Sequence, residues 1–221
     1  MVEASLLYFI VGCMIGWGLD IYRCRLLVQL TETCCLPSGT GNFRRLLTAA
    51  GTGMLFILAG FFCQPGLTLF CCWFFLSCLM LQALIDYDCQ LLPDKISFLL
   101  LVAGFFYAWY FQKNLTSILL SLFVPAAVML VIYFVSRGGM GLGDVKLSAA
   151  LGVWLGADKI LLCLLVAFLT GGVAGMGLLL TGARKRQETI AFGPFLCLGA
   201  AIALLWGDRL LSWYWQFFKI S

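Results

Sequence analysis

Apolar runs of about 20 residues recur along the whole chain, and each could cross a roughly 30 Å hydrocarbon core as an α-helix. The runs are continuous and rich in Leu, Ala and Phe, whereas the strands of a membrane barrel alternate with period two. Only 11% of the residues are charged, against about 25% in a soluble domain. The sequence therefore predicts an all-α, polytopic membrane protein.

We expect about eight transmembrane helices in a single membrane domain covering residues 1–221. A polar segment, residues 23–45, follows the first helix. An aromatic segment, residues 208–221, follows the last helix and suits a membrane–water interface. The expected helices cover residues 4–22, 46–63, 67–85, 96–111, 115–135, 144–155, 160–180 and 190–206.

The distribution of Lys and Arg predicts the orientation. If the N-terminus lies outside, one face receives ten of the 14 basic residues: Arg23, Arg25, Arg44, Arg45, Lys95, Arg137, Lys146, Arg184, Lys185 and Arg186. The other face receives Lys113, Lys159, Arg209 and Lys219. Because basic residues concentrate on the cytoplasmic side, we expect an external N-terminus and a short cytoplasmic loop at residues 23–45.

Histidine is absent, which excludes Ser-His and Cys-His nucleophile pairs and histidine-ligated metals. Most of the 11 cysteines lie inside apolar runs, where cysteine behaves as a small hydrophobe. No cysteines in the polar loop form a CxxC pair, so we expect no zinc site. Carboxylates are therefore the natural candidates for polar chemistry.

Two acidic clusters flank the hairpin made by the fourth and fifth expected helices. Asp86 closes the third apolar run, and Asp144 opens the sixth. Two crossings return the chain to its starting face, so both aspartates should lie at one face of the membrane. Ionisable groups attached directly to membrane helices are functional candidates by default.

Glycines surround Asp144 at positions 138, 139, 141 and 143. Residues without a Cβ atom allow tight turns and close approach of another chain. The structural alternative is a flexible loop in which Asp144 serves as a helix N-cap, which is a common role.

The neighbouring acids have structural explanations. Asp94 follows Pro93 and should cap the fourth helix. Asp20 could pair with Arg23, three residues later, or take part in the site. Asp88 could be a solvated charge or a secondary group of the site.

Two aspartates within hydrogen-bonding distance hold one proton between them, because both cannot ionise easily. One carboxylate can then deprotonate water while the other polarises or protonates a scissile carbonyl. The main alternative is a proton- or cation-coupled transporter that uses Asp86 and Asp144 as a relay. A relay should be distributed across the depth of the bilayer, which placement at one face does not favour.

Three ordered motifs resemble the type IV prepilin peptidases, the bacterial branch of the GxGD membrane aspartic proteases. They read DYDCQLLPD (86–94), GLGDVKLSAALG (141–152) and AFGPFL (191–196). A weaker match is GWGLDIYR (16–23). By motif position the resemblance implies a catalytic pair of Asp86 and Asp144. Residues Asp88, Gly141, Gly143 and Lys146 lie in the same motifs and are expected to bind substrate or shape the site.

The resemblance implies cleavage of the basic leader of prepilins or pseudopilins after a glycine, at the cytoplasmic face of the bacterial inner membrane. Unneutralised carboxylates near the site would suit such a cationic leader. The expected partners are this substrate and the lipid bilayer, with no nucleic acid. The products of such enzymes supply type IV pili, competence pili or type II secretion.

Many members also carry paired CxxC motifs in an enlarged first loop and methylate the new N-terminus with S-adenosylmethionine. Here the corresponding stretch, residues 24–45, is short, and its only cysteine pair is the adjacent Cys34 and Cys35, which is not a CxxC motif. We therefore expect proteolysis without a cofactor and no zinc. This pattern leaves open whether the chain also transfers methyl groups from S-adenosylmethionine.

Overall fold

The computed structural model describes residues 2–30, 41–111, 114–136, 140–181 and 191–219. These residues form eight α-helices, and no strand occurs among them. Six of the helices are long and apolar enough to cross a membrane. The other two, α4 (Asp94–Tyr110) and α6 (Leu142–Leu155), are shorter. The all-α, multi-pass architecture is confirmed.

The chain divides into two compact units, Met1–Cys89 and Gln90–Ser221. Unit 1 contains α1 (Val2–Leu30), α2 (Gly41–Phe62) and α3 (Leu67–Cys89). Unit 2 contains α4 to α8. The expected single membrane domain stays a prediction.

An aromatic contact joins the three helices of unit 1. Trp73 of α3 stacks on Phe56 of α2, with ring centroids 4.9 Å apart, and meets Tyr8 of α1 edge-on at 5.1 Å. The indole N–H of Trp73 also donates to the carbonyl oxygen of Phe56 at 3.3 Å. Large aromatic rings with a satisfied N–H stabilise a core strongly, so these contacts join the three helices near the α2–α3 hairpin.

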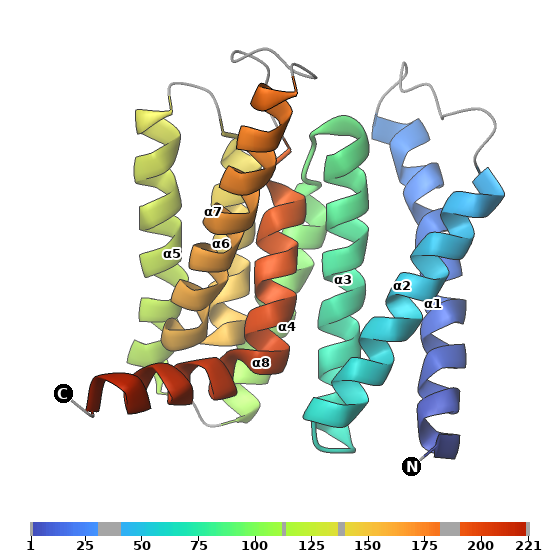
Figure 1. The fold of residues 1–221 in the computed structure, drawn as a ribbon, viewed down its shortest axis with the longest axis horizontal. Helices are drawn as coiled ribbons and strands as arrows, with labels where there is room; N and C mark the ends of the chain where they lie inside the picture. Colours follow the sequence, from blue (N-terminus) through green and yellow to red (C-terminus); the bar gives the residue numbers. More distant parts are fainter. Residues whose placement is uncertain (1, 31–40, 112–113, 137–139, 182–190, 220–221) are drawn as a thin grey trace. The chain divides into compact units, whose positions relative to one another are not determined.

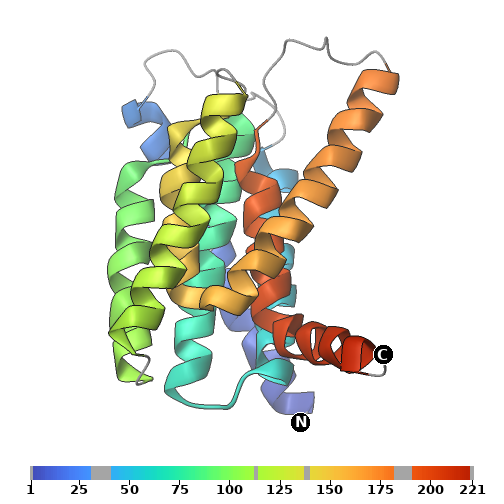
Figure 2. The ribbon, with the colours of Figure 1, turned by 90° about the vertical axis from the view of Figure 1, so that its left-hand side faces the viewer.

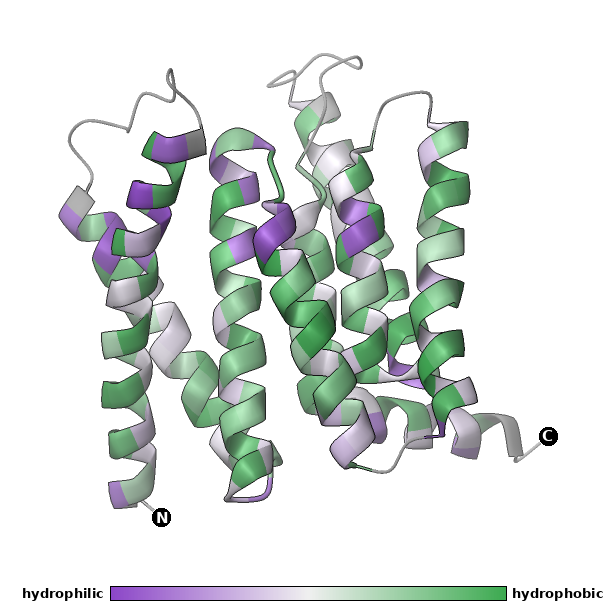
Figure 3. Cartoon of the chain, turned by 180° about the vertical axis from the view of Figure 1, so that it is seen from behind, coloured by the Kyte–Doolittle hydropathy of each residue, from purple (hydrophilic) through white to green (hydrophobic). Residues whose placement is uncertain are grey.

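Both helices around the expected polar loop extend further than their apolar runs. α1 continues to Leu30 and α2 begins at Gly41, so residues 23–30 and 41–45 are helical. The extension of α1 contains no glycine or proline, and arginine and leucine are good helix formers. Hydrophilic residues gather where α1 ends and α2 begins (Figure 3). The rest of the expected loop, including Cys34 and Cys35, lies outside the described residues.

In unit 2, α6 packs against α4, α5, α7 (Ala157–Leu180) and α8 (Gly193–Lys219). Figures 1 and 2 show the arrangement of these helices. Most side chains of α6 from Leu147 to Leu155 are buried. A helix of 14 residues is about 21 Å long and too short to cross a bilayer unaided. Its longer neighbours therefore enclose it, and it forms the core of the unit.

Specific contacts hold α6 in register with α4. The indole N–H of Trp154 donates to the carbonyl oxygen of Leu100 at 2.7 Å. Tyr107 stacks on Trp154 with ring centroids 4.9 Å apart. Gly104 faces the same indole ring, where a larger residue would collide with it.

A proline and a glycine bring α6 close to α5 (Leu115–Val135). Pro125 has no N–H to bond the carbonyl oxygen of Ser121 four residues earlier in α5. Gly152 of α6 packs directly on that carbonyl oxygen, so a methyl group at position 152 would overlap it. The Gly152 Cα–H can therefore make a weak contact with a carbonyl that the proline leaves unused.

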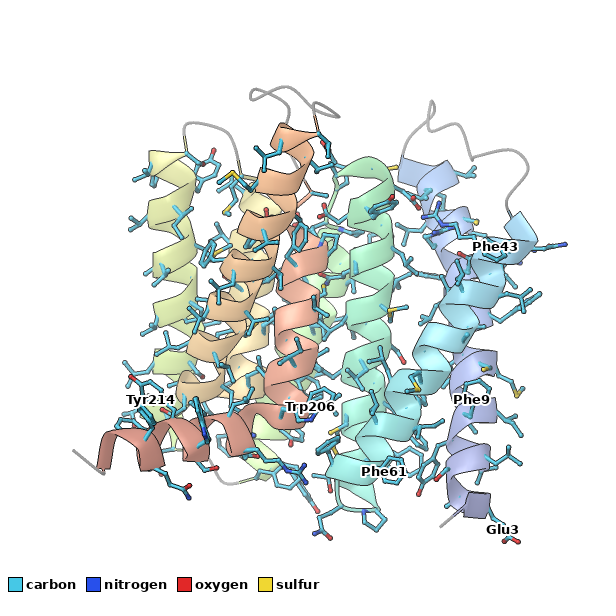
Figure 4. All side chains as sticks on the ribbon, viewed as in Figure 1. Glu3, Phe9, Phe43, Phe61, Trp206 and Tyr214 are labelled. Atoms are coloured by element: carbon cyan, nitrogen blue, oxygen red, sulfur yellow. The ribbon has the colours of Figure 1, made fainter. Side chains whose placement is uncertain are left out.

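Helix α8 changes direction near Trp206 (Figures 1 and 4). At this bend Asp208 forms an ion pair of 2.8 Å with Lys159 in the first turn of α7. Beyond it the aromatic side chains of Trp213, Tyr214 and Trp215 are exposed. The change of direction and the exposed aromatic rings fit the interfacial segment that the sequence predicts.

Candidate functional site

Asp86 lies in the last turn of α3 and is 5% exposed. Gln90, with φ of 52°, follows the helix in the left-handed conformation that commonly ends helices. Gln82 lies one turn before Asp86 and is fully buried. Residues four apart share a helix face, so a buried amide accompanies the candidate catalytic carboxylate.

Four ion pairs between two aspartates and three arginines surround the end of α3. We call Asp20, Arg23, Arg44, Arg45 and Asp88 the arginine–aspartate network. Arg23 contacts Asp20 at 2.8 Å, as expected, and also Asp88 at 3.1 Å. Arg44 pairs with the other oxygen of Asp88, and Arg45 contacts Asp20 at 3.4 Å. Because Asp88 is two residues after Asp86, these pairs fix the part of α3 that carries Asp86.

Asp144 lies in the first turn of α6 and is 6% exposed. The structural alternative, in which Asp144 is the N-cap, is wrong, because Gly141 occupies that position and Asp144 is the third helical residue. Its Oδ2 accepts a hydrogen bond of 3.3 Å from the N–H of Gly141. This bond is one half of a capping box. The helix dipole favours a negative charge at this position.

The two motifs contact each other inside unit 2. Gly143 packs against Leu92, whose Cβ would lie only 2.9 Å from a methyl group at position 143. Lys146 donates to both carboxylate oxygens of Asp94 at 2.8 Å. Gly143 therefore permits the close approach that the sequence predicts. Gly138 and Gly139 lie outside the described residues.

Asp94 does not cap α4, although the sequence predicts that it would. Pro93 holds the N-cap position, and Asp94 is the first helical residue. Pro93 cannot cap with a side chain, and the Asp94 carboxylate instead pairs with Lys146. Both side chains of this pair are exposed.

These pairs change the electrostatic prediction. The sequence suggests unneutralised carboxylates beside the two candidate catalytic aspartates, but Asp20, Asp88 and Asp94 each contact a cation. No group of three potential metal ligands occurs among the described residues. A positively charged substrate would therefore meet carboxylates that are already partly neutralised.

Sequence reasoning missed the partners rather than the acids. Arg44 contacts Asp88 from α2, and Leu92 contacts Gly143 from the segment before α4. Residue spacing along a single helix does not predict either contact. The burial of Gln82 beside Asp86 could have been predicted, because Gln82 is an amide inside an apolar run four residues before Asp86.

The family model that matches this chain is described as the type IV leader peptidase family, and the match covers residues 73–176. Both Asp86 and Asp144 lie inside the matched segment. The chain belongs to this family. It is a multi-pass membrane protein, as its six long apolar helices indicate.

Several curated relatives carry the name prepilin leader peptidase/N-methyltransferase. The protein from Aeromonas salmonicida is 36% identical over 136 residues, covering 59% of this chain and 47% of the relative. The protein from Legionella pneumophila is 34% identical over 167 residues, covering 70% and 55%. The protein from Bacillus subtilis is 32% identical over 166 residues, covering 74% and 66%.

This family member thus spans about half the length of the Aeromonas and Legionella relatives it matches. No solved structure matches the chain significantly.

Proposed function

We propose that this chain is a membrane aspartic endopeptidase that cleaves the basic leader from prepilins or pseudopilins after a glycine. One observation carries the proposal. The segment matched by the leader peptidase family contains two buried aspartates, each held in a terminal turn of an apolar helix. Buried acids in membrane helices are costly and are usually retained for function.

In the proposed reaction Asp86 and Asp144 share one proton. The ionised carboxylate takes a proton from water as the water attacks the carbonyl carbon of the scissile bond. The protonated carboxyl group polarises the carbonyl oxygen and later protonates the leaving amine. The hydrogen bond from Gly141 and the N-terminal end of α6 support Asp144 as the more readily ionised partner.

The other motif residues would hold the two aspartates in place. Asp88 ties the end of α3 to the arginines of α1 and α2. Gly143 and Lys146 tie the start of α6 to the segment that ends the first motif. Catalytic groups must be held within about 0.5 Å of their productive geometry, and these contacts support such precision within each unit.

We place the reaction at the cytoplasmic face of the bacterial inner membrane. The concentration of arginines at one end of unit 1 supports this placement, because basic residues gather on the cytoplasmic side. Proteolysis in this scheme needs no cofactor. The names of the relatives include N-methyltransferase, but we do not assign methyl transfer from S-adenosylmethionine to this chain.

The test uses purified protein and a prepilin that bears a basic leader and a Gly–Phe junction. We expect the wild type to cleave it, and Asp86→Asn and Asp144→Asn each to reduce cleavage by at least about 10³-fold. Asp158→Asn is the matched control, because Asp158 also lies in the first turn of a helix but is exposed. It should retain wild-type cleavage.

Normal cleavage by either dyad variant would reject the mechanism. If the wild type cleaved nothing but moved protons in liposomes, the transporter would be the better description. The product mass with added S-adenosylmethionine tests methylation separately.

A further inference from the structure

Two cysteines of unit 1 lie in contact at the end of the α2–α3 hairpin. Cys63 follows α2 directly, and Cys72 lies in the second turn of α3. The thiol of Cys63 donates to the sulfur of Cys72 at 3.0 Å. A disulfide bond joins its sulfurs at about 2.05 Å, so a movement of roughly 1 Å would bring them to bonding distance.

Hydrogen bonds and a tight turn hold the backbone on both sides of this pair. The N–H of Cys63 donates to the carbonyl oxygen of Ala59 at 2.8 Å. Gly66 makes the turn with φ of 120°, which favours glycine, and its carbonyl oxygen accepts from the N–H of Leu69 at 3.1 Å. Cys72 directly precedes Trp73, which is held by Phe56 and Tyr8. The hairpin therefore presents the two sulfurs to each other without a rearrangement of the helices.

The pair lies at the end of unit 1 away from the arginine–aspartate network. Glu3 and Phe61 mark this end in Figure 4, and Phe43 marks the other. The arginines that pair with Asp20 and Asp88 all lie at the Phe43 end. Because basic residues concentrate on the cytoplasmic side, the cysteine pair faces the opposite compartment. Disulfides persist there, whereas the cytosol keeps thiols reduced.

We propose that Cys63 and Cys72 form a disulfide bond in the mature protein. The oxidant is an external disulfide, either in an oxidoreductase or in a small molecule. The thiolate of Cys63, the more exposed of the two cysteines, attacks one sulfur of the oxidant and releases its first thiolate. The thiolate of Cys72 then attacks the Cys63 sulfur of the mixed disulfide and releases the second. The two protons of the cysteines end on the two thiols of the oxidant.

Metal binding explains this pair less well. A structural zinc ion takes about four ligands, and the described residues contain no group of three candidate ligands. The proposed bond also does not depend on the peptidase reaction. It would tie α2 to α3 and stabilise unit 1 whatever reaction the chain catalyses.

The test traps thiols with acid in intact cells and alkylates them before any reductant is added. Peptide mapping by mass spectrometry should then find a peptide pair linked through Cys63 and Cys72, and both sites unalkylated. Cys63→Ser should make Cys72 reactive towards the alkylating reagent, and Cys72→Ser should do the same for Cys63. Cys71→Ser is the matched control, since Cys71 neighbours Cys72, and it should leave the linkage intact.

A second readout is the thermal stability of the purified protein with and without reductant. Reductant should lower the melting temperature of the purified wild type by about 5 °C, because reduction frees the closed loop in the unfolded chain. Cys63→Ser should show no such response. Alkylation of both cysteines in acid-trapped wild type, or a linkage of Cys63 to Cys71, would overturn the proposal.

Discussion

At the scale of single residues, aspartates near the membrane face serve two different purposes. Asp20 and Asp88 neutralise arginines of neighbouring helices, and Asp94 pairs with Lys146. Asp86 and Asp144 instead lie buried in helix turns inside the segment that the peptidase family matches. The first group forms ion pairs that organise the structure, and the second group carries the proposed chemistry.

The arginine–aspartate network gives a prediction about stability. Asp88→Asn removes the negative charge between Arg23 and Arg44, so we expect the free energy of unfolding to fall by about 1–3 kcal/mol. Asp208→Asn is the matched control, because Asp208 also pairs with one cation but is 84% exposed. Its effect should stay below about 0.5 kcal/mol. Chemical unfolding in detergent measures both values.

The same two variants test whether Asp88 positions Asp86. In the cleavage assay Asp88→Asn should lower kcat more than it raises KM, whereas Asp208→Asn should change neither. Equal losses of stability in the two variants would contradict the structural role of the network.

The sequence patterns identify the important aspartates, but they predict few of the residues that contact them. Asp86 and Asp144 stand out because charged groups are rare in apolar runs, and Asp20 was assigned to Arg23 by helix spacing alone. The pairing of Asp94 with Lys146 could not be read in this way, because 52 positions separate the two residues. Only the packing of α4 against α6 brings them together.

At the scale of helices, α6 determines how unit 2 is organised. It contacts α4 through Trp154 and α5 through Gly152, and it carries Asp144 in its first turn. The GLGDVKLSAALG motif therefore contains both a candidate catalytic residue and the glycine that permits close helix packing. A defect in packing along α6 would displace the carboxylate at its end.

We expect Gly152→Ala to lower the free energy of unfolding by about 1–3 kcal/mol, because the added methyl group overlaps the Ser121 carbonyl oxygen. Gly177→Ala in α7 is the matched control, since a methyl group there meets no atom within 4 Å. It should be neutral or stabilising by up to about 1 kcal/mol, because alanine favours the helix. Thermal unfolding in detergent compares the two, and a Gly152→Ala variant as stable as the control would refute the packing argument.

The apolar runs predicted the order of the eight described helices, six of which are long and apolar enough to cross a membrane, but not all of the helix ends. α1 and α2 continue past their apolar runs, because charged residues also form helix and here find partners across the bundle. The bend in α8 has no marker as clear as a proline inside the helix, although the change from apolar to aromatic and charged residues near Asp208 lies close to it.

At the scale of the whole molecule, the charge distribution predicts the orientation. Export-dependent phosphatase fused after Gly66 or Ser221 should be active, because both positions should lie outside. Fusions after Gly41 or Asp94 should be inactive, and green fluorescent protein fused there should fluoresce. The opposite pattern would invert the orientation and remove the oxidising environment proposed for Cys63 and Cys72.

The short length of α6 has a consequence for how a substrate reaches the proposed site. α7 begins directly after the C-cap of α6, so the two helices meet at one end of unit 2. α6 is about 21 Å long, shorter than a hydrocarbon layer of about 30 Å, so the end that carries Asp144 would not reach the headgroups if its other end lay at the opposite membrane surface. In the proposed reaction, substrate and hydrolytic water would then have to reach Asp144 below the headgroups. A substrate segment at the top of a membrane helix would have to unwind and move below the headgroups before its scissile bond could be cleaved. The rate of cleavage should therefore depend on how easily that helical segment unfolds.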